Sequence, residues 1–434
     1  MFDNQVIPPN EKVKKIRQIL KATQGEIAEG ICTKNNISQI ENNKQRLTAN
    51  LAIGITENFN KIAQEKGMYI PLITVKDLMK DEDSQANDIF RNNIISELKE
   101  IKAIDLCEKK LHEAEELMKK YDISDNEKLQ LYKFAADFYY HKNMYSKSDE
   151  MCNKGLKIDF ALKNITEETI IYIYKSRNSI ETQRYNEALE QLEYAENLNK
   201  RIGNNEFFEK IFFGRALIYR KSGKYDEALK YLSTLKYKFK IEDQKMMIKV
   251  SMVYANCLYN KNRFEEAKKE YIEIIDIAMK IDEKDYIAMA YRNLAEVYFN
   301  EGKYESADIY IKRALTIGFE NQYLNEILYF AAKVFQHVNE DVEGYLKNAL
   351  DFSEKNDKEN FDLIEKIIYE LVLIYISKND EAGIMLMIEK TQELNIDYSL
   401  VYLELIEYYR YRNEEKSEYL SRVLIDKIKQ NKKI

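Results

Sequence analysis

The side chains best suited to specific chemistry in this sequence are amides and bases gathered in one short stretch. Residues 34–46 read KNNISQIENNKQR. Asparagine and glutamine amides can pair with adenine, lysine can pair with guanine, and lysine or arginine can also hold phosphate. This composition suits a segment that reads DNA, provided that a helix presents these side chains to the base edges.

Signs of catalysis are missing from the sequence. It has no glycine-rich phosphate loop, no GxSxG or HExxH motif, and no cysteine and histidine spaced as a catalytic dyad. The cysteines and histidines lie far apart, without the spacing of metal ligands, at Cys32, Cys107, Cys152, Cys257, His112, His141 and His337. We therefore expect no enzyme activity, no cofactor and no metal site.

Composition and the N-terminal sequence indicate a folded cytoplasmic protein. Hydrophobic residues make up 45% and charged residues 32% of the 434 residues, which is typical of soluble folded domains. The first residues, MFDNQVIPPNEKVKK, lack the apolar core of a signal peptide. No apolar run is long enough to span a membrane, and unpaired cysteines suit a reducing compartment.

The periodicity of apolar residues predicts the helices that position the polar stretch 34–46. Apolar residues at helical spacing predict a first helix at about 11–21, and Thr23 and Thr33 are placed to cap a second and a third helix. Leu47 begins the apolar inner face of a fourth. A short helix, a tight turn and another helix form the helix-turn-helix plan, whose second member enters the major groove of DNA.

This region resembles the helix-turn-helix of lambda-type phage repressors and their bacterial relatives. The match rests on TQxEIA at 23–28, ISxIE at 37–41 and NK at 43–44, although Leu47-Thr48 replaces the usual Pro-Ser. The resemblance implies that Gln24 opens the second helix and contacts a phosphate and a neighbouring side chain. It also places five polar residues on the exposed, N-terminal part of the recognition helix and two bases against phosphate just beyond: Lys34, Asn35, Asn36, Ser38 and Gln39, then Lys44 and Arg46.

The distribution of charge and the position of helix-breaking residues also separate the N-terminal region from the rest of the chain. Residues 1–70 hold ten Lys/Arg and seven Asp/Glu, a net charge of +3. Because the whole chain has a net charge of −7, the remaining 364 residues have a net charge of −10. A small basic domain joined to a larger acidic one fits DNA binding at the front. With Pro71 and the acidic stretch 76–84, we predict a helix-turn-helix domain at 1–70, a linker at 71–90 and a helical ligand-sensing domain at 91–434.

The predicted sensing domain is internally repetitive. No proline follows position 71, which favours continuous helix. An aromatic residue followed three places later by a small residue recurs every 40, 40, 39 and 40 residues, at Tyr145/Ser148, Tyr185/Ala188, Tyr225/Ala228, Phe264/Ala267 and Tyr304/Ala307. Another small residue precedes each by about nine places, at Ala136, Ser176, Ala216, Ala255 and Ala295. This pattern resembles a lengthened tetratricopeptide repeat, and we expect an all-α chain in which a right-handed solenoid of about eight helical pairs follows the small domain.

A second set of amides and bases falls on the first helix of the predicted pairs. Stacked pairs curve into a superhelix whose concave face is lined by these first helices. The set is Arg177, Arg220, Asn256, Tyr259, Asn260, Arg292, Asn293 and Asn300. Asparagine can pair with a peptide backbone and arginine can fork onto a carboxylate, so we predict a peptide ligand. A groove residue such as Asn256 is expected to support no core.

The combination resembles the peptide-pheromone receptors of Gram-positive bacteria, the RRNPP group that contains Rap, Rgg, NprR, PlcR and PrgX. The segment EGICT at 29–33 leading into ISQIE at 37–41 is especially similar to the PlcR and NprR type. The resemblance implies a transcription regulator that binds double-stranded operator DNA as a homodimer or higher oligomer. It further implies a short re-imported peptide as ligand and a role in quorum sensing, with control of sporulation, competence, virulence or toxin production.

A scaffold remains an open alternative for the repeats. Helical repeats of this kind can bind a protein partner such as a response regulator. In Rap-like and NprR-like relatives such binding stimulates dephosphorylation, which needs no catalytic motif in the repeat protein itself. The residues alone do not separate this alternative from peptide-controlled DNA binding.

Overall fold

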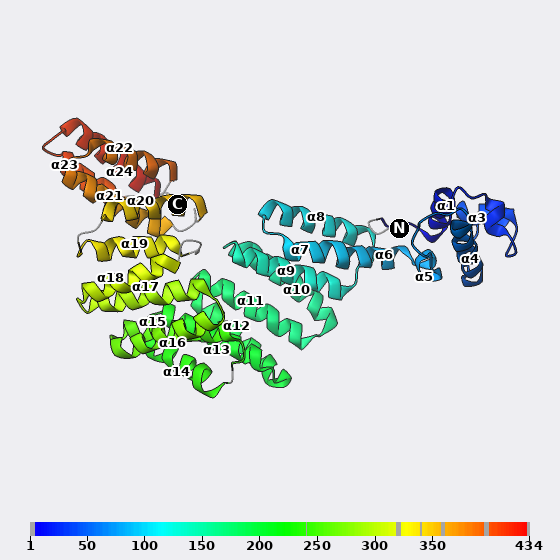
Figure 1. Cartoon of the computed structure of the whole chain (residues 1–434), viewed down its shortest axis with the longest axis horizontal. Helices are drawn as coiled ribbons and strands as arrows, with labels where there is room; N and C mark the ends of the chain where they lie inside the picture. The colour runs from blue at the N-terminus through cyan, green and yellow to red at the C-terminus, as the bar shows by residue number, and fades with distance from the viewer. Residues whose placement is uncertain are drawn as a thin grey trace. The chain divides into compact units, whose positions relative to one another are not determined.

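The computed structural model describes residues 5–239, 241–317, 323–338, 341–356, 361–394 and 399–431. Within these ranges the secondary structure is helical and contains no strand. The chain divides into two compact units, residues 1–214 and 215–434, which are described separately below (Figure 1). None of the described helices is both long and apolar enough to cross a membrane.

The chain begins with four helices, which are α1 (Pro9–Ile19), α2 (Gln24–Ala28), α3 (Lys34–Glu41) and α4 (Ala49–Glu65). The first starts two residues earlier than expected because a proline at the N-terminal position needs no hydrogen-bonded amide and already has a helical φ. Thr23 and Thr33 cap α2 and α3, as predicted, and each forms a capping box with the third residue of its helix. The two helices on which the DNA prediction rests therefore begin where the sequence indicates.

One apolar core joins these helices and continues beyond them. Ile16, Ile37 and Phe59 are buried together, and Ile73 and Leu78 pack into the same core. The stretch expected to be a linker therefore contains folded elements, which are α5 (Val75–Met79) and α6 (Glu82–Ile89). The latter continues without a break into the π-helical turn η1 (Phe90–Ile95) and α7 (Ser96–Glu100).

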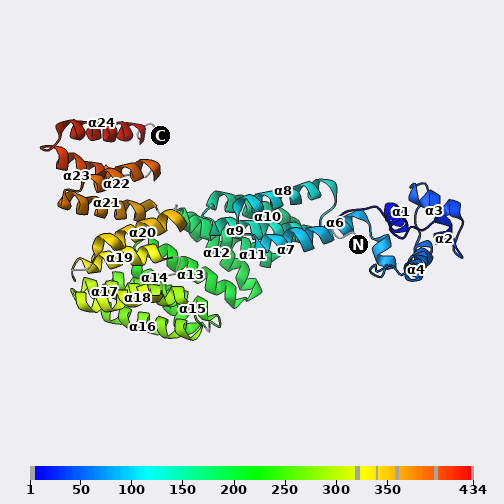
Figure 2. The same cartoon turned by 45° about the horizontal axis from the view of Figure 1, so that its top comes forward.

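The rest of the chain is a series of helices, and most consecutive members within each unit pack side by side (Figures 1 and 2). They are α8 (Ile104–Lys120), α9 (Asp125–His141), α10 (Tyr145–Leu162), α11 (Ile165–Glu181), α12 (Tyr185–Ile202), α13 (Asn205–Lys221), α14 (Tyr225–Lys238), α15 (Gln244–Asn260), α16 (Phe264–Lys280), α17 (Lys284–Asn300), α18 (Tyr304–Ile317), α19 (Leu324–Phe335), α20 (Val342–Asn356), α21 (Phe361–Lys378), α22 (Glu381–Leu394), α23 (Ser399–Tyr409) and α24 (Glu414–Asn431). In the described part of the chain, the two members of a helical pair pack closely against each other in seven pairs between α9 and α24. The fold is an all-α, tetratricopeptide-type solenoid, as predicted.

The repeat phase read from the sequence is confirmed. Each of the five aromatic residues is the first residue of a second helix, in α10, α12, α14, α16 and α18. A residue with positive φ lies two places before each of them, at Asn143, Gln183, Gly223, Asn262 and Gly302. Glycine and asparagine adopt this left-handed conformation most easily, so the turn chemistry and the aromatic mark the same boundary.

Small residues allow the two helices of a pair to approach closely. Ser148, Ala228 and Ala307 are buried. The small residues that precede them by about twelve places, on the first helix of each pair, are buried as well: Ala136, Ala216 and Ala295. In the first of these pairs the Ser148 hydroxyl donates a hydrogen bond of 2.8 Å to the carbonyl of Ala136. A larger side chain at such a position has no space unless the helices separate.

We expect Ala307→Leu to lower the free energy of unfolding by ~1–3 kcal/mol, because overpacking forces α17 and α18 apart. Ile309→Ala is the matched control on the same helix, where the side chain is 52% exposed, and it should change stability by less than about 0.5 kcal/mol. Urea denaturation followed by circular dichroism measures both. Equal midpoints for Ala307→Leu and the unaltered chain would contradict the close approach.

Candidate DNA and peptide interfaces

The start of α3 is organised by its own cap. The Thr33 hydroxyl accepts a hydrogen bond of 3.2 Å from the Asn36 amide, and the Asn36 side-chain oxygen accepts one of 3.3 Å from the Thr33 amide. Ile37 and Ile40 anchor the helix in the core. Lys34, Asn35 and Gln39 are left exposed.

The predicted base-reading residues are therefore not equivalent. Asn35 and Gln39 are four residues apart and share one helix face. Ser38 is half-buried. The side chain of Asn36 is engaged in the cap, and its amide nitrogen also donates a hydrogen bond of 3.4 Å to Gln45. The first turn of α3 thus presents Lys34, Asn35 and Gln39 to solvent and uses Asn36 for its own structure.

The turn after α3 carries the two predicted phosphate-binding bases. Lys44 and Arg46 are both exposed. Asn43 adopts a left-handed conformation with φ 55°, and the backbone amide of Lys44 donates a hydrogen bond of 2.8 Å to the carbonyl of Gln39. The turn is folded back on the end of α3, so both bases lie beside that helix.

A charged cluster that sequence reasoning missed joins α1, α2 and α3. Arg17 donates hydrogen bonds of 2.6 and 2.9 Å to the two carboxylate oxygens of Glu41, whose side chain is 3% exposed. The hydrogen bonds to Glu41 raise the pKa of Arg17. Gln24 donates a hydrogen bond of 2.9 Å to the same carboxylate. Gln24 was predicted to contact a phosphate and a neighbouring side chain; Glu41 is such a neighbour, and this bond fixes the Gln24 side chain at the start of α2.

Among the predicted peptide-binding residues, Arg177 lies in the first unit. Its guanidinium carbon lies 4.1 and 4.3 Å from the ring centres of Tyr174 and Tyr140. A guanidinium nitrogen of Arg177 donates a hydrogen bond of 2.8 Å to Asp137. These neighbours come from α9 and α11, the first helices of two successive pairs. The sequence signal for them was their position on first helices, although only Arg177 was selected.

In the second unit, Asn256 and Asn293 are part of the packing. The side-chain oxygen of Asn256 accepts hydrogen bonds of 2.6 Å from the Tyr271 hydroxyl and 3.3 Å from Asn293. Asn293 is 6% exposed, and Tyr271 is 1% exposed. Burial raises the pKa of Tyr271 well above its ordinary value, which keeps the hydroxyl a donor. The expectation that Asn256 supports no core was wrong, because it satisfies a buried hydroxyl.

The other predicted residues of α15 and α17 lie around this pair. Asn300 donates a hydrogen bond to the hydroxyl of Tyr259. Arg292 donates hydrogen bonds of 3.0 Å to Asn293 and 2.6 Å to Glu296, and its guanidinium carbon lies 4.9 Å from the ring centre of Phe330. The side chain of Asn260 is exposed and donates a hydrogen bond of 2.7 Å to the carbonyl of Asn256.

Arg220 is half-buried on α13. The structure therefore brings Asn256, Tyr259, Arg292, Asn293 and Asn300 together across α15 and α17, while Arg177 belongs to the other unit. In the described ranges, no three His, Cys, Asp or Glu side chains gather as a metal site would require.

One family model matches part of the chain. Residues 215–390 match the model of a family described as the C-terminal domain of suppressor of spindle checkpoint defect 1. No curated protein matches the sequence.

Several solved structures are similar. A signal transduction ATPase with numerous domains from Pyrococcus horikoshii, which has a tetratricopeptide repeat sensor, is 14% identical with a TM-score of 0.50, over 97% of this chain and 72% of that one. The apo form of the quorum sensor NprR from B. thuringiensis is 18% identical with a TM-score of 0.47, over 79% and 97%. PlcR from Bacillus thuringiensis, in complex with the peptide PapR7 and DNA, is 14% identical with a TM-score of 0.29, over 80% and 94%. The likeness to the repeat sensor shows the fold.

We expect Asn256→Ala to lower the free energy of unfolding by ~1–3 kcal/mol, because the buried Tyr271 hydroxyl and the Asn293 amide lose their acceptor. Asn260→Ala, on the same helix but at an exposed position, is the matched control and should change stability by less than about 0.5 kcal/mol. Urea denaturation of both variants gives the comparison. A loss of stability as large for Asn260→Ala as for Asn256→Ala would refute the assigned roles.

Proposed function

We propose that this protein is a DNA-binding transcription regulator whose activity is controlled by a short peptide bound to the repeat helices. The observation that carries the proposal is the capped helix α3, which presents Lys34, Asn35 and Gln39 over a buried apolar anchor beside two exposed bases. Its attachment to a tetratricopeptide-type array supports a sensor role for the remainder. The division is into a DNA-binding part at 1–70, a connection at 71–90 and a sensing part at 91–434.

For DNA binding, α3 enters the major groove with its N-terminal turn against the base edges. Asn35 and Gln39 suit adenine and Lys34 suits guanine. Lys44 and Arg46, just beyond α3, contact phosphate, which fixes register without reading sequence. Gln24, held by Glu41, lies at the start of α2, where a helix N-terminus favours a phosphate.

For ligand binding, the α15 and α17 surface offers donors and acceptors suited to a peptide backbone. Asn260 is exposed, while Tyr259 and Arg292 are half-buried and already oriented by neighbouring side chains. Asn256 and Asn293 act mainly by holding this surface in shape. Arg220 suits a carboxylate, such as the free end of a peptide.

The sequence resemblance to RRNPP peptide-pheromone receptors extends the proposal to oligomeric state and setting. We propose a cytoplasmic homodimer that binds a two-fold operator, because one helix-turn-helix buries little DNA surface. The peptide shifts the balance of conformations by the difference in its affinity between them. A protein partner such as a response regulator is the alternative occupant of the repeats.

We expect Asn35→Ala to weaken binding to the specific operator by ~1–3 kcal/mol and to spare non-specific DNA, since it removes a base contact. Lys44→Ala should weaken binding to every sequence and reduce the slope of log affinity against log salt by about 1. Lys119→Ala is the control, because this exposed lysine lies on α8. The operator is selected from random DNA with the unaltered protein, and mobility-shift titrations at several salt concentrations follow. Unchanged operator affinity in both test variants would exclude α3 as the reading helix.

The peptide proposal has its own measurement. Native mass spectrometry of the protein purified from its own cells should reveal a bound short peptide, and the synthetic form of that peptide is then titrated by calorimetry. We expect Asn260→Ala to reduce its affinity about tenfold, since one charge-free hydrogen bond is lost without disturbing the core. Full affinity in Asn260→Ala would place the peptide elsewhere. A protein partner bound in place of the peptide would favour the scaffold.

A further inference from the structure

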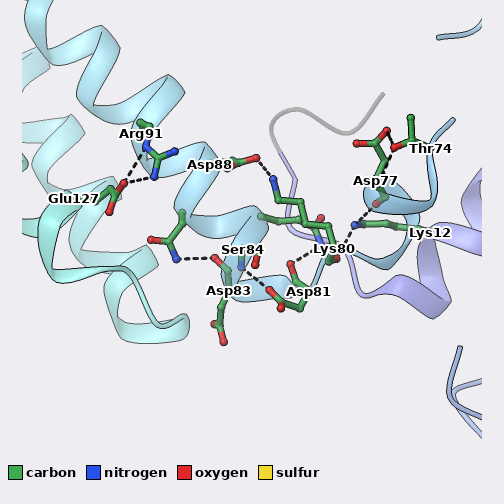
Figure 3. Close-up of polar contacts among 12 residues, drawn as sticks. Lys12, Thr74, Asp77, Lys80, Asp81, Asp83, Ser84, Asp88, Arg91 and Glu127 are labelled. Atoms are coloured by element: carbon green, nitrogen blue, oxygen red, sulfur yellow. Dashed lines mark hydrogen bonds and ion pairs between the residues drawn. The ribbon is translucent and has the colours of Figure 1, made fainter. Parts of the chain in front are cut away.

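The continuous helix made of α6, η1 and α7 is fixed to the first repeat helices. Arg91 donates a hydrogen bond of 2.9 Å to Glu127 on α9 (Figure 3). The Asn87 side chain accepts a hydrogen bond of 2.8 Å from the Ser124 amide and donates one of 2.8 Å to the carbonyl of Asp122. Phe90 is fully buried in the core that this helix shares with α8. This helix therefore has a set position against the turn between α8 and α9.

The same helix is tied to the front of the chain by Gln85. This side chain is 8% exposed, and its amide oxygen accepts a hydrogen bond of 3.2 Å from the backbone amide of Ile7. Its nitrogen donates hydrogen bonds of 2.8 Å to the carbonyl of Ile7 and 2.9 Å to the carbonyl of Lys80. Gln85 therefore pairs with both backbone polar groups of Ile7, two residues before α1 begins.

Lys12 on α1 reaches the same place from the other side. It is 3% exposed, and its ammonium donates hydrogen bonds of 2.8 Å to the carbonyl of Asp77 and 2.9 Å to the carbonyl of Lys80 (Figure 3). The carbonyl of Lys80 thus accepts one hydrogen bond from α1 and one from α6, which uses both of its lone pairs. An ion pair between the Lys80 side chain and Asp88 closes the turn between α5 and α6.

We propose that Lys12, the Lys80 carbonyl and Gln85 form a rigid joint that fixes the direction of the helix-turn-helix relative to α6 and the first repeat helices. The side chains of Lys12 and Gln85 are only 3% and 8% exposed. Rotation about the joint would therefore break several of their hydrogen bonds at once, which costs free energy wherever water does not replace them. Apolar contacts alone allow such sliding at little cost. Hydrogen bonds that join three segments of the chain at one carbonyl do not allow such sliding.

The consequence for DNA rests on the proposed function. A dimer on a two-fold operator must hold its two recognition helices about one helical turn apart, roughly 34–36 Å. A flexible connection would accept many half-site spacings, whereas a rigid joint selects one. Lys12 and Gln85 are positioning residues in this scheme, since they touch no base.

Spin-label distances test the joint without reference to DNA. Labels are attached through Ile53→Cys on α4 and Leu106→Cys on α8, both exposed, in a chain in which Cys32→Ser removes the accessible native thiol. We expect a narrow distance distribution that widens at least about twofold in Gln85→Leu and in Lys12→Met, because each removes donors from the joint. Gln18→Leu and Lys14→Met, at exposed positions of α1, are the matched controls and should keep the narrow distribution.

Circular dichroism of each variant checks folding, and the two test variants break different bonds, so one remains informative if the other misfolds. A distribution that is already broad in the parent chain would overturn the joint. Unchanged widths in both test variants would do the same.

Operator spacing tests the role of the joint in the proposed function. The unaltered protein should lose about tenfold or more in affinity when five base pairs are inserted between half-sites, and Gln85→Leu should lose far less. Affinity for a single half-site should be equal in the two proteins. If no half-site is bound by either protein, the DNA-binding proposal fails, while the spin-label result still decides the joint. If both proteins depend on spacing alike, the joint does not set it.

The buried amine gives a further signature. Burial and the neighbouring charge of Lys80 lower the pKa of Lys12 to about 8, against the opposing pull of Asp77 and Asp81. The ordinary pKa of a lysine is 10.5. Between pH 8 and pH 10.5 the unfolded chain therefore binds more protons at Lys12 than the folded chain does, so the contribution of Lys12 to the free energy of unfolding rises with pH. We expect the stability of the unaltered chain relative to Lys12→Met to increase from pH 7.5 to pH 10 in urea titrations. A difference that stays constant or falls would show that the amine is not buried in this way.

Discussion

The close approach of paired helices is the constraint on which most of this structure depends. Each pair buries one apolar face against its neighbours and has no core of its own. Contact requires a small residue where the axes come nearest, and Ser148, Ala228 and Ala307 meet that requirement with no exposed surface. The positions of side chains further along each helix follow from this contact. The polar surface of α15 and α17 is therefore a consequence of packing as much as of its own hydrogen bonds.

Features with a local cause were predictable from the sequence. The caps at Thr23 and Thr33 depend on residues three places away, and the repeat phase depends on an aromatic, a small residue and a turn within a few positions. Long-range polar contacts have no such signature. Lys12 meets carbonyls 65 and 68 residues away, and Gln85 pairs with Ile7 across 78 residues. A stretch rich in Asp, Glu and Lys was therefore interpreted as a linker, although Ile73 and Leu78 within it are buried.

The same amide side chain has different roles at adjacent positions, and burial separates them. Asn35 is exposed on α3, while Asn36 completes the cap of that helix. Asn260 is exposed on α15, while Asn256 one turn earlier accepts a hydrogen bond from a buried hydroxyl. Residue type and helical spacing selected all four as candidate contacts. Only the three-dimensional neighbourhood shows which are available to a partner and which hold the surface that presents the others.

The polar groups inside the first unit fix the relative orientation of helices more than they add to the free energy of unfolding. Glu41, Lys12 and Gln85 are all buried, and buried charges gain little net stability over apolar residues of the same volume. Their geometry is narrow, however, because each donor is held by acceptors that come from a different segment of the chain, such as the Lys80 carbonyl for Lys12 and the Ile7 carbonyl for Gln85. The hydrogen bonds of Glu41 fix α3 relative to α1 and α2, and those of Lys12 and Gln85 fix α1 relative to α6. The polar interior therefore connects the exposed side chains of α3 with the first repeat helices through a series of hydrogen bonds.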